Sequence, residues 1–289
     1  MVSKALIAVI IIAVVLAVVG AVYFMIFPSA EPPATLVIRA GTVEVNSGNS
    51  WATATSGMQL SADYSVRTGA DGDAVVIFFG ASALRLGPNT EIRLSEILTN
   101  FTSIELSNGQ TWSRILKVSG IEEYEIETPT TVATVRGTGF AVVVRGNDTD
   151  VTVGDGSVSV GTIRKEFAAG AARRVVLAQA NVTANQTVEI KAATLDQPLV
   201  VRRLEYIDAW VAKNIGEDVT FMAEVKARIR QKYGFLIGAA KDRYNLTDAN
   251  VDTYLDKIIS GEIRIPSNVQ ELLASGSTDI ASIERATSG

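Results

Sequence analysis

Acidic residues at predicted turns are the first candidates for chemistry in this sequence. A hard cation such as Ca²⁺ binds several carboxylate and carbonyl oxygens supplied by loops. Two groups have a suitable spacing, Asp71 with Asp73, and Asp148 with Asp150 and Asp155. No EF-hand or nonapeptide pattern surrounds either group, and Asp and Asn are common turn formers. We therefore expect turns here and no metal site.

Four glutamates, Glu122, Glu123, Glu125 and Glu127, could in principle supply the carboxylate pair of a glycosidase. Their positions fall on a predicted strand, where successive side chains point to opposite faces. Acidic strand faces are usually solvated, so we expect a non-enzymatic protein.

The composition excludes several kinds of site. The chain has neither Cys nor His, which rules out Ser-His-Asp and Cys-His catalysis, disulfides, and zinc bound by thiolate or imidazole. We expect no cofactor. The formal net charge is −5 and no basic run is present, which argues against a nucleic-acid partner.

The stretch 128–144 contains the most distinctive local pattern. Arg136-Gly137-Thr138-Gly139 separates two runs of β-branched and apolar residues, so it predicts a sharp turn between two core strands. Closely spaced glycines indicate positive φ or close backbone approach, and Thr138 can bond locally. Arg136 either binds an anion or satisfies nearby carbonyls, and its turn-and-core neighbours favour the structural role.

These residues need a β scaffold, and the pattern of residues 35–192 predicts one. Short apolar-alternating runs recur at intervals of roughly 8 to 12 residues, as in an antiparallel sandwich, a roll or a β-solenoid. Among the separating turns we place Gly87-Pro88-Asn89, Asn108-Gly109 and Gly154-Asp155-Gly156.

The N-terminus predicts a membrane anchor. Residues 5–27 are uncharged and mostly aliphatic, and as a helix they would span roughly 35 Å, enough to cross a bilayer. Residues 1–4 include Lys4 and form the short cytoplasmic end, so the positive-inside rule places the rest outside. Residues 28–34 form a Pro-rich linker. Cleavage after the helix, or prepilin-type processing just before it, are the alternatives.

The C-terminal part has a helical period. Residues 200–274 form the predicted helical region, with Leu204, Ile207, Val211 and Ile215 on one face. Thr247 is a predicted helix cap. Residues 275–289 are rich in Ser and Thr and form the predicted flexible tail.

Five Asn-x-Thr sequons indicate N-glycosylation, with chance as the alternative. They are Asn100, Asn147, Asn181, Asn185 and Asn245. Such modification would suit an archaeal-type envelope.

A family resemblance rests on many pieces in one order. They are Gly41-x-Val-x-Val, Trp51, Gly57-x-x-Leu60, Val66-Arg67-Thr68-Gly69, Asp71-Gly72-x-Ala74, Leu84-Arg85-Leu86-x-Pro88-x-Thr90, Leu106-x-x-Gly109-x-x-Trp112, Thr128-Pro129-Thr130, Arg136-Gly137-Thr138-x-Phe140 and Gly156-x-Val158. Over about residues 38–180 the chain resembles the FecR domain. Within it, Arg67, Thr68, Gly69, Thr128, Pro129 and Arg136 to Gly139 are interpreted as structural motif residues.

The resemblance implies an extracytoplasmic, non-enzymatic signal-relay module. In well-known members a cytoplasmic arm controls a sigma factor, and the distal end contacts an outer-membrane receptor. Only residues 1–4 precede the apolar run here, so we expect no sigma-factor arm. The helical C-terminal region also differs from the mixed receptor-contacting domain of those regulators.

Two hypotheses follow. The first is a single-pass, membrane-anchored surface protein whose FecR-like domain binds or senses a protein or glycan, or acts as an envelope scaffold. The alternative is a pilin-like or envelope-layer subunit that assembles through its apolar N-terminal helix. The ligand and the oligomeric state stay open.

Overall fold

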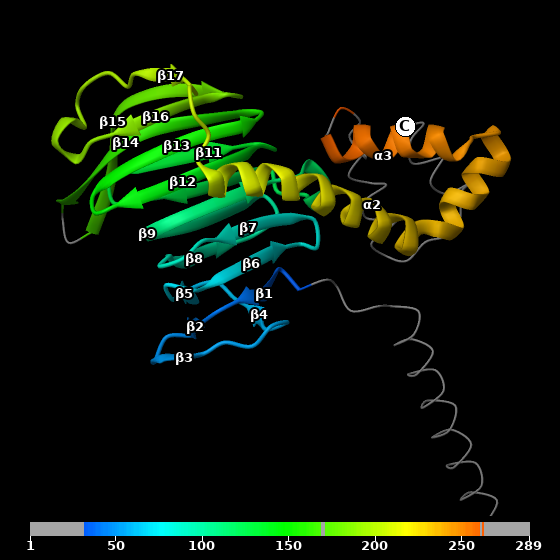
Figure 1. Ribbon diagram of the computed structural model, residues 1–289, viewed down its shortest axis with the longest axis horizontal. Helices are drawn as coiled ribbons and strands as arrows, with labels where there is room; N and C mark the ends of the chain where they lie inside the picture. The colour runs from blue at the N-terminus through cyan, green and yellow to red at the C-terminus, as the bar shows by residue number, and fades with distance from the viewer. Residues whose placement is uncertain (1–31, 169–170, 261, 263–289) are drawn as a thin grey trace, which may run out of the picture. The chain divides into compact units, whose positions relative to one another are not determined.

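The computed structural model describes residues 32–168, 171–260 and 262 (Figure 1). The described chain is mainly β, with strands β1 to β17 followed by helices α2 and α3, which confirms the predicted fold class for this part. It divides into two compact units. One is Pro32–Lys232 with Asp252–Ile263, and the other includes Tyr233–Val251. All strands belong to the first unit.

The strands form two sheets that share β9. Every strand pair is antiparallel except the parallel pair β9–β10. Sheet A runs in the order β4 (Gln59–Leu60), β1 (Ala34–Ala40), β6 (Asp73–Phe78), β7 (Ser82–Leu86), β9 (Phe101–Arg114), β12 (Gly139–Arg145), β13 (Asp148–Asp155), β16 (Gln186–Ile190) and β17 (Val201–Arg203). Sheet B runs in the order β3 (Trp51–Thr53), β2 (Val43–Asn46), β5 (Ser65–Thr68), β8 (Glu91–Ile97), β9, β10 (Glu123–Glu127), β11 (Thr131–Val135), β14 (Ser157–Ala168) and β15 (Ala171–Thr183).

Strand β9 passes from one sheet to the other near its middle. Its pairing with β8 in sheet B ends at Asn108, and its pairing with β12 in sheet A begins at Gly109. Gly109 has a φ of +94°, and a Cβ there would lie 2.4 Å from Thr90 Oγ1. The predicted turn at Asn108-Gly109 is therefore wrong. Glycine lets a continuous strand bend against the β7–β8 loop.

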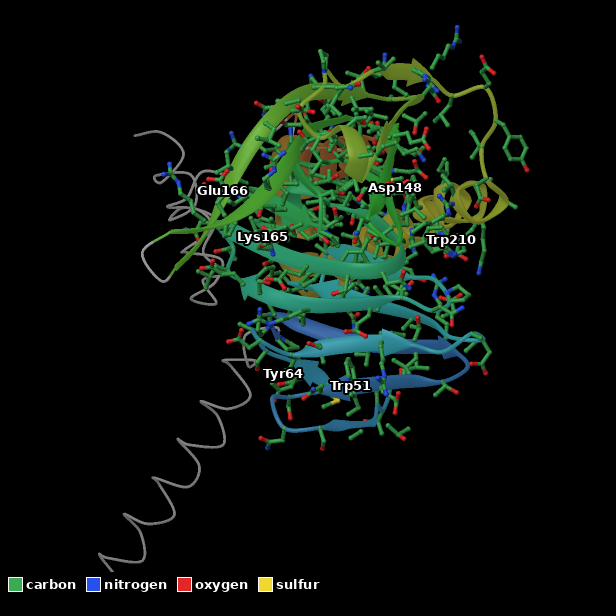
Figure 2. All side chains as sticks on the ribbon, turned by 90° about the vertical axis from the view of Figure 1, so that its left-hand side faces the viewer. Trp51, Tyr64, Asp148, Lys165, Glu166 and Trp210 are labelled. Atoms are coloured by element: carbon green, nitrogen blue, oxygen red, sulfur yellow. The ribbon has the colours of Figure 1, made fainter. Side chains whose placement is uncertain are left out.

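The core lies between the two sheets and follows the period of two that strands require. The largest rings, Phe78, Tyr124 and Phe140, pack edge to face, with centroids 6.1 Å and 6.4 Å apart. The Tyr124 hydroxyl accepts a bond from Ser113 Oγ at 3.4 Å, and burial raises the pKa of Tyr124. The β14–β15 ribbon extends outward, with Lys165 and Glu166 toward its free end (Figure 2).

The strand region continues past the predicted boundary at residue 192, because β17 adds to the edge of sheet A beside β16. Helix α2 (Ala209–Tyr244) begins later than the predicted residue 200. Asp208 is its N-cap, because Asp208 Oδ1 accepts the Trp210 N–H at 2.8 Å. Leu204 and Ile207, placed on a helical face from the sequence, therefore precede the helix.

Helix α3 (Asp248–Ser260) starts where the sequence predicts. The Asn250 N–H donates to Thr247 Oγ1 at 3.2 Å, and the Thr247 N–H donates to Asn250 Oδ1 at 3.0 Å. This reciprocal cap is the capping-box arrangement with Asn in place of Glu or Gln.

Several predictions fall outside the described residues. They concern the cytoplasmic end (1–4), the transmembrane helix (5–27), most of the linker (28–34) and the tail (275–289). Across residues 32–168 and 171–260, no helix combines the length and apolar character needed to cross a membrane.

Candidate functional site on the outer face of sheet A

The turn formed by Arg136 to Gly139 joins β11 to β12 and is anchored on both sides. Gly137 has a φ of +86°, which favours glycine. Thr138 Oγ1 donates to the Ser157 carbonyl at 2.9 Å, and the Thr138 carbonyl accepts the Ile115 N–H at 3.0 Å. Thr138 thus ties the turn to two neighbouring segments.

Arg136 makes one hydrogen bond that bears on its two interpretations. Its Nε donates to the Glu122 carbonyl at 2.9 Å, at an exposed position. A guanidinium satisfying a carbonyl fits the structural role. Anion binding by Arg136 stays the alternative interpretation, which a binding measurement tests.

The second glycine of the turn makes space for a buried arginine. A Cβ at Gly139 would lie 2.7 Å from both Cζ and Nη2 of Arg114 on β9. Real Cβ atoms do not approach that closely, so a side chain at position 139 would displace the Arg114 guanidinium from its present position. The two glycines therefore serve the two purposes expected from the sequence, positive φ at one and close approach at the other.

The other motif residues hold loops together. Thr68 is buried, and its Oγ1 donates to the Gly87 carbonyl at 2.6 Å and accepts the Thr90 N–H at 2.9 Å. The neighbouring Gly69 N–H donates to the Thr42 carbonyl at 2.9 Å. The Thr68 bonds fix the loop between β7 and β8 against the end of β5, and the Gly69 bond fixes the loop between β1 and β2 there.

Arg67 and Thr128 also have intramolecular partners. Arg67 Nε donates to Glu44 Oε2 at 2.7 Å on the outer face of sheet B. Thr128 is buried and its Oγ1 accepts the Thr131 N–H at 2.9 Å, across a turn that contains the exposed Pro129.

A buried carboxylate on α2 joins the helix to sheet A. Asp218 is 1% exposed. Its Oδ1 accepts Arg85 Nη1 at 2.6 Å, its Oδ2 accepts Arg114 Nε at 2.7 Å, and Trp112 Nε1 donates to the same group at 3.1 Å. Three donors from β7 and β9 therefore converge on one helix side chain.

Arg114 lies at the centre of this arrangement. Besides Asp218 it binds Asp155 of β13, with Nη1 2.7 Å from Oδ2. Burial alone lowers the pKa of Arg114, but the charges and hydrogen bonds of Asp218 and Asp155 outweigh burial and raise it. The guanidinium is therefore charged at any physiological pH and needs its carboxylate partners.

Apolar contacts flank the polar cluster on both sides. Val211, in the first turn of α2, packs on Trp112 of β9 and Ala141 of β12. Figure 1 shows this end of the helix beside β12. A Cβ at Gly154 would lie 2.8 Å from the Trp112 ring, so glycine again makes room. Further along, the second apolar cluster comprises Val75, Ala81, Ala83, Leu116, Phe221, Val225 and Ile259.

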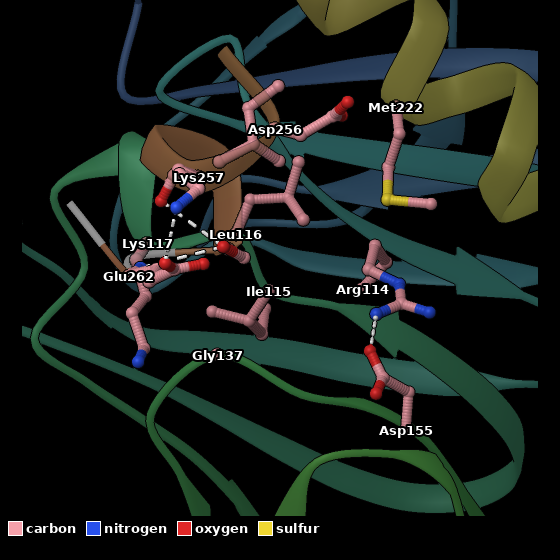
Figure 3. A pocket seen from close by; sticks show the side chains of 12 residues that line it. Arg114, Ile115, Leu116, Lys117, Gly137, Asp155, Met222, Asp256, Lys257 and Glu262 are labelled. Carbon is pink, nitrogen blue, oxygen red and sulfur yellow. Dashed lines mark hydrogen bonds and ion pairs between the residues drawn. The ribbon is translucent and has the colours of Figure 1, made fainter. Parts of the chain in front are cut away.

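A cleft of about 420 Å³ opens beside Gly137, at the end of this interface (Figure 3). Its charged groups are mostly paired: Arg114 with Asp155, and Lys257 with Glu262 at 2.8 Å. The bond to Glu262 raises the pKa of Lys257. The cleft thus has mixed charge and no concentrated acidic or basic wall.

Comparison with known proteins identifies the scaffold. Residues 64–159 match the family model described as FecR protein. They form a FecR domain. Similarity extends to two crystal structures of a proposed anti-sigma factor from Parabacteroides distasonis, at 14% and 15% identity and TM-scores of 0.36 and 0.31. These matches cover 48% and 43% of this chain and 59% and 51% of the other, less than two thirds of either structure. No curated protein matches the chain.

The buried cluster combines the FecR domain with a helix outside the matched region. Arg85, Trp112 and Arg114 lie within residues 64–159, whereas Asp218 does not. Arg85 and Trp112 belong to the sequence pattern that resembles the family. In the structure they bind Asp218 and hold α2 on the outer face of sheet A.

Sequence reasoning missed Asp218, although a signal for it exists. It falls within the apolar stripe of α2, between Ile215 and Met222, where a charged side chain is unexpected. Arg85, flanked by Leu84 and Leu86 in a strand buried on both faces, is the corresponding signal on the sheet.

Each aspartate considered for metal binding is paired instead with a backbone N–H or with a lysine or arginine side chain. Asp71 Oδ1 accepts the Thr42 N–H at 3.1 Å, and Asp73 lies 3.2 Å from Lys213 Nζ. Asp148 accepts the Ala192 N–H at 2.9 Å. The remaining two bind arginines, Asp150 with Arg145 and Asp155 with Arg114. In the described part of the chain, no three acidic side chains gather as a metal site would need.

Two of the three glutamates of β10 pair with basic residues of the β14–β15 ribbon. Glu125 is buried and binds Arg174 Nη1 at 2.6 Å, and Glu127 binds both Arg174 and Lys165. The hydrogen bond to Glu125 raises the pKa of Arg174, against the opposing effect of burial. These pairs connect β10 with the ribbon across the outer face of sheet B.

Every sequon asparagine has an exposed side chain: Asn100, Asn147, Asn181, Asn185 and Asn245. Their threonines differ. Thr102 and Thr149 are buried, whereas Thr183 and Thr247 are exposed.

Proposed function

We propose that this chain is a non-enzymatic protein anchored in the cell membrane through residues 5–27. Its FecR domain lies outside the cytoplasm, where it binds or senses a protein or glycan, or acts as an envelope scaffold. The observation that carries the proposal is the order of parts: an uncharged run of 23 residues, a short linker and then the FecR domain. A run of that length suffices to cross a bilayer.

The ion pairs of the candidate catalytic carboxylates support binding over catalysis. Glu125 pairs with Arg174, and Glu127 pairs with Arg174 and Lys165. The acidic net charge of −5 suits a protein or glycan partner better than nucleic acid.

The placement is tested in intact cells that express the full chain. We expect the protein to stay in the membrane fraction after alkaline washing, and external protease to digest the FecR domain while a cytoplasmic marker survives. A variant lacking residues 5–27 is the matched control and should leave the membrane fraction. Full protection of the FecR domain in intact cells would overturn the proposed location.

The N-terminal sequence and intact mass of the native protein test the anchor itself. A retained anchor keeps residues 5–27 and begins at or near Met1. Loss of only the residues before Ala5, with the apolar run kept, would replace the anchor by the pilin-like assembly subunit.

A further inference from the structure

The β15 strand leaves one side of sheet B open. Its ladder runs along β14, from Ala171 opposite Ala168 to Thr183 opposite Ser157. No ladder on its other side is formed by the described residues. An open edge of this length presents unpaired backbone N–H and C=O groups, to which a second strand can add.

The side chains of β15 also favour the addition of a second strand. Val176 is 50% exposed and lies over Gly161, beside Val132 of sheet B. The strand contains no proline, and its neighbours Val175 and Leu177 are only half buried. Two arginines, Arg173 and Arg174, lie near the start of the strand, but the segment from Val175 to Ala178 is apolar. Apolar edge segments without charge or proline are prone to pairing with copies of themselves. A bulky polar group on this strand would keep two copies of the edge apart.

Asn181 is placed to do so. Val182 points into the core with 0% exposure, so Asn181 and Thr183 share the outer face of β15. Both are exposed, and they form the Asn-Val-Thr sequon. Ser157 Oγ donates to Asn181 Oδ1 at 2.8 Å. That bond holds the amide by its oxygen, and Nδ2 has no hydrogen-bond partner among the described residues.

Within the FecR-domain unit, the other sequons lack this combination. Thr102 and Thr149 are buried, and the Thr187 hydroxyl donates to the Val151 carbonyl at 3.0 Å. Asn185 lies in the β15–β16 turn, not on the open edge. Asn181 is thus the sequon within this unit that combines an exposed asparagine and threonine with an open strand.

We propose that Asn181 is an N-glycosylation site whose glycan covers the open edge of β15 and keeps copies of the protein from pairing there. At about 3.3 Å per residue, Val176 lies roughly 16 Å along the strand, within reach of a glycan of several sugars. The inference rests on the proposed function, since it requires the domain to lie where N-glycans are attached.

The chemistry is a glycosyl transfer from a lipid-phosphate-linked oligosaccharide. The bond between the anomeric carbon and the phosphate oxygen breaks, and a bond from that carbon to Asn181 Nδ2 forms. The amide nitrogen loses one proton, and the lipid phosphate leaves with the electron pair of the broken bond and takes up that proton. An external glycosyltransferase supplies the catalysis.

The first experiment is glycopeptide mass spectrometry on the full chain purified from its native membrane. We expect the Asn181 peptide to carry hexose-containing mass, and the Thr183→Ala variant to lose it while keeping Asn181 and its bond to Ser157. The Thr183→Ser variant keeps the sequon and should keep the glycan. Finding unmodified Asn181 in protein that external protease digests would overturn this inference and leave the proposed location standing.

The second experiment measures self-association in detergent by light scattering. The glycosylated protein should be monomeric. The Asn181→Gln and Thr183→Ala variants should pair through β15 and have about twice the monomer mass. Adding Val176→Lys to either variant should restore the monomer mass. The matched control Asn185→Gln removes a neighbouring sequon outside the strand and should not change the mass. Monomeric Asn181→Gln and Thr183→Ala proteins would overturn the covering role.

Discussion

Replacing Asp218 by alanine is the sharpest test of how α2 is held on sheet A. The substitution removes the carboxylate that accepts Arg85 Nη1 at 2.6 Å, Arg114 Nε at 2.7 Å and Trp112 Nε1 at 3.1 Å. The Arg85 and Arg114 side chains are only 3% and 9% exposed, so water cannot readily take the place of the carboxylate.

The size of the effect follows from the partners that remain. Removing one member of a buried ion pair costs about 3–5 kcal/mol. Arg114 keeps Asp155 at 2.7 Å, and Arg85 keeps Glu217 at 3.6 Å, which places the cost near the lower limit, about 3 kcal/mol. For a domain of this size that corresponds to a fall in Tm of about 6–12 °C.

The loss should appear first as undocking of the helix. Hydrogen exchange of α2 amides within residues 209–232 should accelerate by about 100-fold, since each 1.4 kcal/mol is a factor of ten. Glu217→Gln is the matched control. Its side chain is 28% exposed and pairs with Arg39 at the surface. It also lies 3.6 Å from Arg85, but Arg85 keeps Asp218 at 2.6 Å in this variant, so the expected cost is below about 1 kcal/mol. Equal effects of Asp218→Ala and Glu217→Gln would refute the role assigned to the buried carboxylate.

Two further substitutions test neighbouring features. Gly139→Ala should lower the free energy of unfolding in urea by about 1–3 kcal/mol, because the new Cβ would collide with Arg114. The control Gly216→Ala, at an open helical site, should raise it by roughly 0.5–1 kcal/mol. If Gly139→Ala left the free energy of unfolding unchanged, Arg114 would be free to move. The Ala192 N–H lowers the pKa of Asp148, so wild type should be more stable than Asp148→Asn above about pH 4 and lose that advantage as pH falls toward the lower folded pKa; a difference independent of pH would contradict this.

Much of the sheet was predictable because its determinants are local. Alternating apolar residues between turn-forming pairs predict strands at 35–39, 64–68, 74–79 and 91–98, each within one residue of the observed ends of β1, β5, β6 and β8. The bend at Gly109 was misread, because a glycine after asparagine signals a turn equally well whether the chain reverses or crosses between sheets. Only the contact with Thr90 distinguishes the two cases, and it is non-local.

The buried cluster could be predicted only in part. An arginine within the apolar strand β7 and an aspartate within the apolar stripe of α2 are each visible in the sequence as exceptions. Their pairing is not, since 133 positions separate Arg85 from Asp218. Long-range partners of this kind depend on which face of the sheet the helix covers, and periodicity alone does not specify that face.

The turn motif gains a physical meaning from this pairing. Gly139 has no side chain because Arg114 occupies the space, and Arg114 is buried there because Asp218 and Asp155 neutralise it. A β sandwich alone would not need a buried arginine at that position, since burying a charge without a partner is costly. The glycine in the FecR motif is therefore explained in part by a helix outside the matched residues. It follows that removing α2 would leave Arg85 without Asp218 and Glu217, and Arg114 with Asp155 as its remaining carboxylate partner.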